Sequence, residues 1–339
     1  MDSIKNNMVD VSIIVPAFNH AKYISKTFDS ILNQKTGFSY EIVVGDDCSG
    51  DHSGEIIQKY MDRHPEVFVN ITRDKNIGAT NNVYELLKKA RGKYIAFCEG
   101  DDYWCDDARM ERDINWLNKN PEYIGICGRT VPVGENGGKL DMEDIPAEET
   151  FWIYEKECFT IKEFSEWQMP GHLSALTLRN IFQNSSAGSS VIKKAHPVVA
   201  DRTIVLMGAL YGPIKCSQHV VSCYRFRITG NGVNFMSEFK KKNMRYEDYH
   251  MMRIFEKYAW KKFHRQLDLS AIKADRFIGS VLVWMNGMDR RDWEVVWKIV
   301  LENGHKIRCI YYIGNIAVKK KIMQIFGREK RIEGRRYRL

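Results

Sequence analysis

The chain has 339 residues, 44% of them hydrophobic and 12% aromatic, which excludes a disordered protein and allows a sizeable core. None of its eight cysteines forms a CxxC pair, so a zinc ribbon and a redox dithiol are not supported, and a reducing cytosol fits best. The net charge is +8, and residues 319–339 alone carry nine basic and two acidic side chains. The rest of the chain is nearly neutral, which argues against a nucleic-acid groove within the fold.

In chain order, apolar runs typical of buried strands alternate with segments whose apolar residues recur at helical spacing. We expect strands at 11–18, 41–45, 67–72 and 94–98, and helices at 19–33, 53–63, 81–90 and 109–118. This alternation predicts a series of right-handed βαβ units, and hence a mainly parallel sheet flanked by helices in the α/β class.

The pattern weakens beyond residue 120. Residues 129–149 are rich in glycine and acidic side chains and predict a loop, 174–178 and 213–226 predict extended chain, and 201–210 predict a helix. From about residue 237 helical spacing dominates, with tryptophans among lysines and arginines. We therefore expect one α/β domain over 1–234 and a mostly helical region with a basic tail over 235–339.

No stretch approaches the ~20 consecutive apolar residues of a membrane-spanning helix, and the N-terminal segment lacks an apolar signal core. The sequence therefore predicts a protein that is soluble or peripheral to a membrane. The basic run 319–339 suits anionic lipid headgroups, and a solvated tail or a nucleic-acid contact are the alternatives.

Three carboxylates follow the fourth expected strand, at Glu99, Asp101 and Asp102. Because like charges at close range disfavour one another, such a cluster suggests a cation. Ligands of open α/β sheets bind at the carboxyl ends of the strands, so we expect a divalent metal site that holds a diphosphate. The alternative is a solvated acidic turn.

Polar residues also follow the first two strands, in Pro16-Ala17-Phe18-Asn19 and Asp46-Asp47-Cys48-Ser49. In a parallel sheet these ends lie at the same edge as the acidic cluster, where a carboxylate can accept hydrogen bonds from a base or a ribose. Capping of the next helix is the alternative. The loop 74–82 offers backbone N–H groups to an anion or is an ordinary loop. Neither a P-loop nor a GxGxxG motif is present, which argues against a dinucleotide dehydrogenase.

The segments VPAFN, EIVVGDDCSGD, NIGATNN, ARGKYIAF and EGDD occur in this order within the first 105 residues. Together they strongly resemble the family 2 glycosyltransferases, which have the GT-A fold and transfer a sugar with inversion from a nucleotide diphosphate donor. The resemblance continues through 172–180 and 201–227. It implies that 1–234 is a GT-A, Rossmann-like catalytic domain that binds a nucleotide-sugar.

Carried over by position, the resemblance implies three groups of donor-binding residues. The nucleoside would be held by Pro16, Ala17, Asn19, Asp46 and Asp47. The donor pocket near the phosphates would be lined by Asn76, Gly78 and Asn82. The metal, Mn²⁺ or Mg²⁺, would be bound with the diphosphate by Asp101, flanked by Glu99 and Asp102. Position 99 departs from the family, which usually has Asp there.

The resemblance also places the general base at Asp201, at the start of the expected helix 201–210. An inverting displacement needs a base opposite the leaving group to take the proton of the acceptor hydroxyl. A first-turn Asp favoured by the helix dipole is the alternative role, and the lesser candidates for the base are Asp106, Asp107 and Glu166.

Arg225 or Arg227 would neutralise the diphosphate, unless these are edge-strand arginines that face water. His172 would lie near the acceptor or be structural.

The function that follows is transfer of a sugar from a nucleotide diphosphate-sugar, with a UDP-sugar favoured, to a glycan or lipid-linked acceptor of cell-surface polysaccharide synthesis. Residues 319–339 would dock on an anionic membrane surface, so the expected location is cytoplasmic and peripheral at the inner face of the membrane, without a nucleic-acid partner. A sugar nucleotidyltransferase-like enzyme and a non-catalytic binding module that keeps the fold are the alternatives.

Overall fold

The computed structural model describes residues 9–71, 73–141, 156–183, 186–226, 244–287, 289–303, 309–311 and 313–314. The chain divides into two compact units, Met1–Gly232 and Val233–Leu339. Arg227 and the basic tail 319–339 lie outside the described residues.

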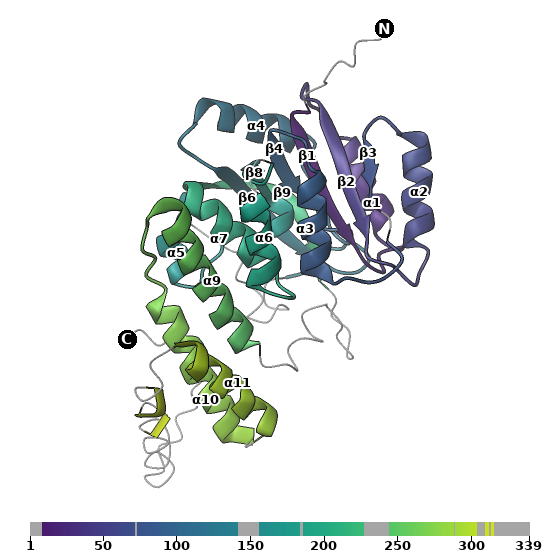
Figure 1. Ribbon diagram of the computed structural model, residues 1–339. Helices are drawn as coiled ribbons and strands as arrows, with labels where there is room; N and C mark the ends of the chain where they lie inside the picture. Colours follow the sequence, from purple (N-terminus) through teal and green to yellow (C-terminus); the bar gives the residue numbers. More distant parts are fainter. Residues whose placement is uncertain are drawn as a thin grey trace. The chain divides into compact units, whose positions relative to one another are not determined.

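The first unit is built on a nine-stranded sheet (Figure 1). Its strands are β1 Val11–Ala17, β2 Tyr40–Asp46, β3 Phe68–Asn70, β4 Tyr94–Phe97, β5 Tyr103–Trp104, β6 Gly125–Val133, β7 Cys158–Phe159, β8 Leu176–Arg179 and β9 Ile214–Arg225. They run in the order β3-β2-β1-β4-β8-β6-β9-β5, and β7 pairs with β9. The strands β3, β2, β1 and β4 are parallel, as βαβ units require, whereas β8 is antiparallel to both β4 and β6.

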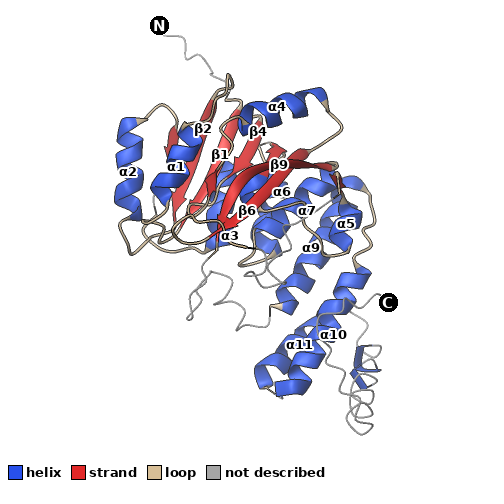
Figure 2. Cartoon of the chain, turned by 180° about the vertical axis from the view of Figure 1, so that it is seen from behind, coloured by secondary structure: helices blue, strands red, loops and turns tan. Residues whose placement is uncertain are grey.

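Helices cover both faces of this sheet. They are α1 Ile24–Leu32, α2 Ser53–Arg63, α3 Ala79–Lys89, α4 Arg109–Lys119, α5 Ile161–Ser165, α6 Ser186–Ala195 and α7 Asp201–Tyr211, with the 3₁₀ turn η3 Leu173–Ala175. Figures 1 and 2 show α3, α6 and α7 on one face and α1, α2 and α4 on the other. The sheet is thus the middle layer of three.

The central strand β1 shows why these residues form this layer. Val11, Ile13 and Val15 pack with Ile24 and Phe28 of α1 in one core cluster. Ile14 points to the opposite face and is equally buried. Because both faces of β1 are covered, the strand is continuously apolar and shows no alternation with polar residues.

The first expected helix begins later than its pattern suggested. Asn19 adopts a left-handed φ of 57°, and the carbonyl oxygen of His20 accepts from the N–H of Tyr23 at 2.8 Å and of Ile24 at 2.9 Å. The helix therefore starts at Ile24 instead of residue 19. The five residues before it form a turn at the end of β1.

The prediction of a loop over 129–149 is wrong for residues 129–133. Residues 129–133 continue strand β6, which lies between β8 and β9 and has register irregularities around Arg129. Both partners are distant in sequence, and the irregularity disturbs the alternation of side chains, so no local pattern marked the strand. Residues 142–149 lie outside the described part of the chain.

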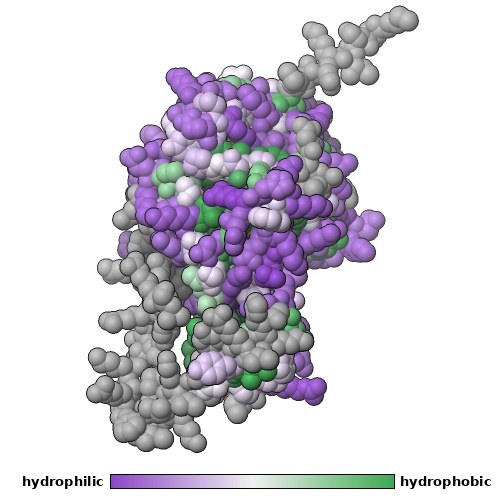
Figure 3. All heavy atoms as spheres, turned by 60° about the vertical axis from the view of Figure 1, so that its left-hand side comes forward, coloured by the Kyte–Doolittle hydropathy of each residue, from purple (hydrophilic) through white to green (hydrophobic). Residues whose placement is uncertain are grey.

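The second unit contains α9 Arg245–Phe263, α10 Ser270–Gly287 and α11 Arg290–Asn303, in agreement with the helical region expected there. Its core contains Tyr249, Phe277, Val281, Val296, Ile299, Val300 and Cys309. Apolar residues, green in Figure 3, are visible at the surface of this unit. Among the described residues, no helix has the length and hydropathy needed to cross a bilayer.

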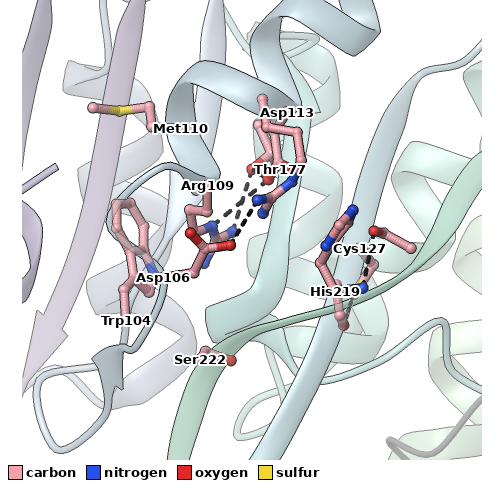
Figure 4. A network of polar contacts seen from close by, with 12 residues as sticks. Trp104, Asp106, Arg109, Met110, Asp113, Cys127, Thr177, His219 and Ser222 are labelled. Carbon is pink, nitrogen blue, oxygen red and sulfur yellow. Dashed lines mark hydrogen bonds and ion pairs between the residues drawn. The ribbon is translucent and has the colours of Figure 1, made fainter. Parts of the chain in front are cut away.

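A buried ion pair within α4 is hydrogen-bonded to the sheet and to η3 (Figure 4). Arg109 is fully buried, and its Nε lies 3.6 Å from an Asp113 oxygen. Its guanidinium group also donates to the Ser174 carbonyl at 2.6 Å and to the Thr177 hydroxyl at 3.3 Å, and it lies over the Trp104 ring. Burial lowers the pKa of Arg109, and the nearby carboxylate of Asp113 opposes that shift. The pair therefore fixes the packing of α4 beside β8 and η3.

Replacing Arg109 by leucine should lower the free energy of unfolding by about 3–5 kcal/mol, because the buried Asp113 carboxylate loses its buried ion-pair partner and, within the described residues, keeps only Arg112, at 3.9 Å. Urea denaturation measures the change. The control Arg63→Leu, on an exposed turn of α2, should change the free energy by less than about 0.5 kcal/mol. The double variant Arg109→Leu with Asp113→Leu should recover part of the loss. A cost below about 1 kcal/mol for the single variant would contradict a structural role for this pair.

Candidate functional site

The carboxyl ends of three parallel strands meet at one edge of the sheet. The carbonyl oxygen of Pro16, near the end of β1, accepts from the N–H of Gly100 at 3.0 Å. The carbonyl oxygen of Ala17 accepts from the N–H of Asp47 at 2.9 Å. The segments after β1, β2 and β4 are therefore joined through the backbone of β1, as the parallel order predicted.

Asn19 links the first two of these segments. Its N–H donates to the Ser49 hydroxyl at 2.8 Å, and its side-chain oxygen accepts from the Gly50 N–H at 2.9 Å. The Ser49 hydroxyl in turn donates to Asp46, which is half-buried at the end of β2. Asn19 itself is exposed, so this corner presents both Asn19 and Asp46 at the strand ends.

Two predicted donor-binding residues are buried beneath the loop 74–82. Asp47 is 2% exposed, and its two carboxylate oxygens accept from the N–H groups of Ile77 and Gly78, each at 2.8 Å. Asn82 is also 2% exposed and donates to the Gly45 carbonyl at 2.8 Å. Gly78 has a φ of 86°, which only glycine adopts readily. Asp47 and Asn82 therefore hold the loop in place, while Asn76 is exposed on it.

The acidic cluster after β4 is a tight turn with one buried and two more open carboxylates. Asp102 is 1% exposed. Its oxygens accept from the Ser174 hydroxyl at 2.6 Å and from the Arg225 N–H at 3.0 Å. The Asp101 side chain is 30% exposed and that of Glu99 is 36% exposed. Asp102 thus anchors the turn that presents Glu99 and Asp101.

His172 faces this turn from the segment before η3. Its Nε2 lies 3.5 Å from Glu99, and its Nδ1 lies 3.4 Å from Asp102 and accepts from the Ser174 N–H at 3.3 Å. Ligand atoms of Glu99, Asp102 and His172 all lie within 4.8 Å of one another, so this group can hold a metal ion. The sequence predicted that Asp101 binds the metal, and that role of Asp101 stays a prediction. It predicted that His172 lies near the acceptor or is structural.

The electrostatics of this group favour a cation. Burial, and then the charges of Asp102, Asp101 and Asp201, raise the pKa of Glu99 well above its usual value. Burial lowers the pKa of His172 to about 4, so its imidazole is neutral near pH 7 and suited to a metal. A divalent cation would relieve the repulsion between the carboxylates.

Asp201 lies in the first turn of α7, and an oxygen of its carboxylate accepts from the Arg202 N–H at 2.6 Å. Burial raises the pKa of Asp201, and the Arg202 charge opposes this. Since Asp201 also raises the pKa of Glu99, the two carboxylates lie near enough to repel. The charge of Asp201 therefore acts on the acidic turn, and its role as the general base stays a prediction.

The lesser candidates for a base are engaged elsewhere. Asp106 pairs with Arg112 at 2.7 Å and Asp107 with Lys35 at 2.6 Å, while Glu166 ends the short helix α5. Only Asp201 among these four carboxylates contributes to the raised pKa of Glu99.

Arg225 is buried and does not face water. It is 5% exposed, and its guanidinium group donates to the carbonyls of Asp101 at 2.9 Å and Glu135 at 2.6 Å. The expectation of an arginine on a water-facing edge strand is wrong, because β9 has β6 on one side and β5 on the other. The hydrogen bonds place Arg225 against the acidic turn as a support, and its contact with the diphosphate stays a prediction.

Sequence reasoning missed two basic residues near these strand ends. His20 places Nε2 3.6 Å from an Asp101 oxygen, and its buried Nδ1 has no hydrogen-bond partner within the described residues. Arg73 follows β3 and is half-buried near Asp46 and Asp47, and its Nη2 likewise lacks a partner in the described part of the chain. Their position in the sequence could have identified them. His20 comes shortly after β1 and Arg73 shortly after β3, at the edge of the sheet where ligands bind.

Residues 12–182 match the model of the family described as Glycosyl transferase family 2, which is half of the chain. The chain belongs to glycosyl transferase family 2.

Two of the similar sequences illustrate the range of relatives. An uncharacterized protein of Mycobacterium tuberculosis is 32% identical over 176 residues, which cover 52% of this chain and 45% of the relative. TuaG of Bacillus subtilis, named for teichuronic acid biosynthesis, is 30% identical over 131 residues, or 39% of this chain and 50% of TuaG. The chain thus spans about half of the length of these family 2 relatives.

A third relative also has a solved structure. TarS of Staphylococcus aureus, named a poly(ribitol-phosphate) beta-N-acetylglucosaminyltransferase, is 38% identical over 135 residues, which cover 37% of this chain and 23% of TarS. The structure of its residues 1–349 with UDP-GlcNAc superimposes with a TM-score of 0.50 at 15% identity and covers 92% of each chain. The family 2 chain therefore has the GT-A fold, as its motifs predicted.

The buried carboxylate of Asp47 gives a test of how the loop is held. In the variant Asp47→Ala, the N–H groups of Ile77 and Gly78 lose their shared acceptor, so amide exchange in a peptide spanning 74–82 should become faster. The unfolding free energy should fall by about 1–3 kcal/mol. Hydrogen-exchange mass spectrometry measures the first effect. The matched control Asp74→Ala, an exposed carboxylate of the same loop, should leave exchange unchanged. Equal exchange in Asp47→Ala and the native protein would remove this role.

Proposed function

We propose that this protein is an inverting, metal-dependent glycosyltransferase that moves a sugar from a nucleoside diphosphate-sugar to the hydroxyl of a glycan or lipid-linked acceptor. The observation that carries the proposal is the meeting of three strand ends at one sheet edge, where a group of side chains can hold a cation. The separate carboxylate of Asp201 contributes to the raised pKa of Glu99 in that group. Family membership supports the reaction class. The catalytic domain we propose is 1–234, followed by the helical region 235–339.

The nucleoside end of the donor binds at β1 and β2. The bottom of the nucleoside site is formed by Pro16, Ala17 and Asn19. The half-buried carboxylate of Asp46 accepts hydrogen bonds from hydroxyl or N–H groups of the nucleoside. Arg73 adds a cationic hydrogen-bond donor near Asp46, where the diphosphate joins the nucleoside. Asn76 and Gly78 line the next part of the path on a loop that Asp47 and Asn82 hold from below.

The diphosphate lies at the acidic turn with Mn²⁺ or Mg²⁺. The residues that would hold the ion are Glu99, Asp102 and the neutral His172. The more open carboxylate of Asp101, on the same turn, would join them as the sequence motif implies. When bound, the ion supplies charge neutralisation for the departing diphosphate. Asp102 and Arg225 keep the turn in shape from beneath.

Asp201 takes the proton of the acceptor hydroxyl. As the acceptor oxygen forms its bond to the anomeric carbon, the bond from that carbon to the diphosphate oxygen breaks, and the configuration inverts. The diphosphate leaves with the electron pair of the broken bond. Burial of Asp201 makes its carboxylate a stronger base than an exposed aspartate, which suits this role.

The names of relatives support the substrate class. TuaG is named for teichuronic acid biosynthesis and TarS for transfer of N-acetylglucosamine to poly(ribitol-phosphate), so we propose a cell-surface polysaccharide acceptor. A UDP-sugar is the first donor to test, because TarS is a sequence relative that was solved with UDP-GlcNAc. The location we propose is the cytoplasmic face of the membrane, with the basic run 319–339 at the lipid surface.

A panel of nucleotide-sugars incubated with the protein and Mn²⁺ tests the reaction class. We expect one donor to release its nucleoside diphosphate, chelation by EDTA to abolish the release, and added Mn²⁺ to restore it. Release should fall at least about 100-fold in Asp101→Ala. Formation of a nucleotide-sugar from a nucleoside triphosphate and a sugar phosphate would instead identify a nucleotidyltransferase. Metal-independent release would contradict the proposed cation.

The variant Asp201→Asn should lower kcat about 100- to 10,000-fold with the KM for the donor little changed, because the amide cannot accept the proton. In the native protein kcat/KM should fall as the pH drops through the raised pKa of Asp201, since the protonated carboxyl is no longer a base. Steady-state kinetics across pH measure both effects. The control Asp62→Asn, on the exposed side of α2, should keep native turnover. Native turnover in Asp201→Asn would assign the base elsewhere.

A further inference from the structure

The exposed large hydrophobic residues of the described chain gather in the second unit. They are Phe18, Val220, Trp260, Trp297, Leu301, Ile310 and Tyr311, and the last five belong to the shorter described part, after residue 233. Scattered single apolar residues are normal on a protein surface, whereas a contiguous apolar patch marks an interaction surface.

Helix α11 has apolar residues outside the face that packs in the core. Val296, Ile299 and Val300 are fully buried in the core of the unit. Trp297 and Leu301 lie one helical turn apart on the adjoining face and are 37% and 59% exposed. An apolar face wider than its packing partner, next to a polar face, is typical of a helix that lies at a membrane interface.

The aromatic residues around this face form a continuous row. The ring centroids of Trp284 and Trp293 are 4.3 Å apart, and those of Trp293 and Trp297 are 5.5 Å apart. Tryptophan prefers the interfacial layer of a bilayer, where one part of its ring system is apolar and its N–H meets water. Ile310 and Tyr311, 52% and 67% exposed, follow the buried Cys309 of the same core.

The charge of the chain indicates which surface these residues meet. Arg290 and Arg291 begin α11 with side chains 91% and 88% exposed, although each also pairs with a nearby carboxylate. The run 319–339, which continues the chain soon after Tyr311, has nine basic and two acidic side chains. Apolar residues followed by a basic run match a layer of anionic lipid headgroups over an apolar interior.

We propose that Trp297 and Leu301 of α11, with Ile310 and Tyr311, insert into the interfacial layer of an anionic lipid bilayer. This insertion surface is distinct from the basic run, whose charge would supply electrostatic attraction. It would bring a lipid-linked acceptor and the protein to the same surface, yet lipid binding itself does not depend on the proposed transfer reaction.

Vesicle flotation with the full chain tests the proposal. Binding to vesicles of phosphatidylcholine with one third phosphatidylglycerol should exceed binding to pure phosphatidylcholine. The double variant Trp297→Ser with Leu301→Ser should bind the mixed vesicles at least about tenfold more weakly. The matched control Val220→Ser, a 43% exposed apolar residue on β9, should bind as the native protein does. Equal binding by the double variant and the control would overturn the proposal.

A second measurement covers the case in which the double variant folds poorly. Brominated acyl chains should quench the native fluorescence more than that of Trp297→Phe, because Trp297 would sit among the chains. Equal quenching would overturn insertion at this position. If the double variant instead converts a dimer to a monomer in light scattering and keeps native vesicle binding, the surface joins two copies of the chain and the proposal fails. If the native protein binds the vesicles but turns over no nucleotide-sugar, the proposed function fails and the proposed insertion stands.

Discussion

A carboxyl group is stable in a protein interior only when hydrogen-bond partners surround it. Asp102, 1% exposed, has the Ser174 hydroxyl and the Arg225 N–H, and these come from segments 72 and 123 residues away in the chain. The acidic turn after β4 is therefore fixed to η3 and to β9 at once. Because both donors must be in place, the geometry of Glu99 and Asp101 depends on the packing of the whole first unit.

The polar residues at the strand ends divide into two kinds. Asp47, Asn82 and Arg225 are buried, and each satisfies backbone groups of a neighbouring loop or turn. Asn19, Asp46 and Asp101 are more open, and they stand at the edge where ligands of α/β sheets bind. The hydrogen bonds of the buried residues hold the loops that carry the more open residues. A site built on loops therefore has a defined shape before a ligand binds.

The two units also differ in what their surfaces offer. In the first unit the features of interest are charged groups at one sheet edge, suited to a diphosphate and a cation. In the second unit they are apolar and aromatic residues on α11 and at 310–311, suited to a lipid interface. The transfer to a lipid-linked acceptor that we propose would need both kinds of surface, and the chain has one in each unit.

The sequence by itself determined the parallel half of the sheet and the meeting of 16–19, 46–49 and 99–102. Apolar runs and helical spacing are local signals, and the order of parallel βαβ units then decides which strand ends become neighbours. Only the tertiary structure decided that β6 continues through residues 129–133, that Asp47, Asn82 and Arg225 support the site from beneath, and that His172 and His20 face the acidic turn. Strand pairing, burial and side-chain contact depend on residues far apart in the chain, so a local pattern carries no record of them.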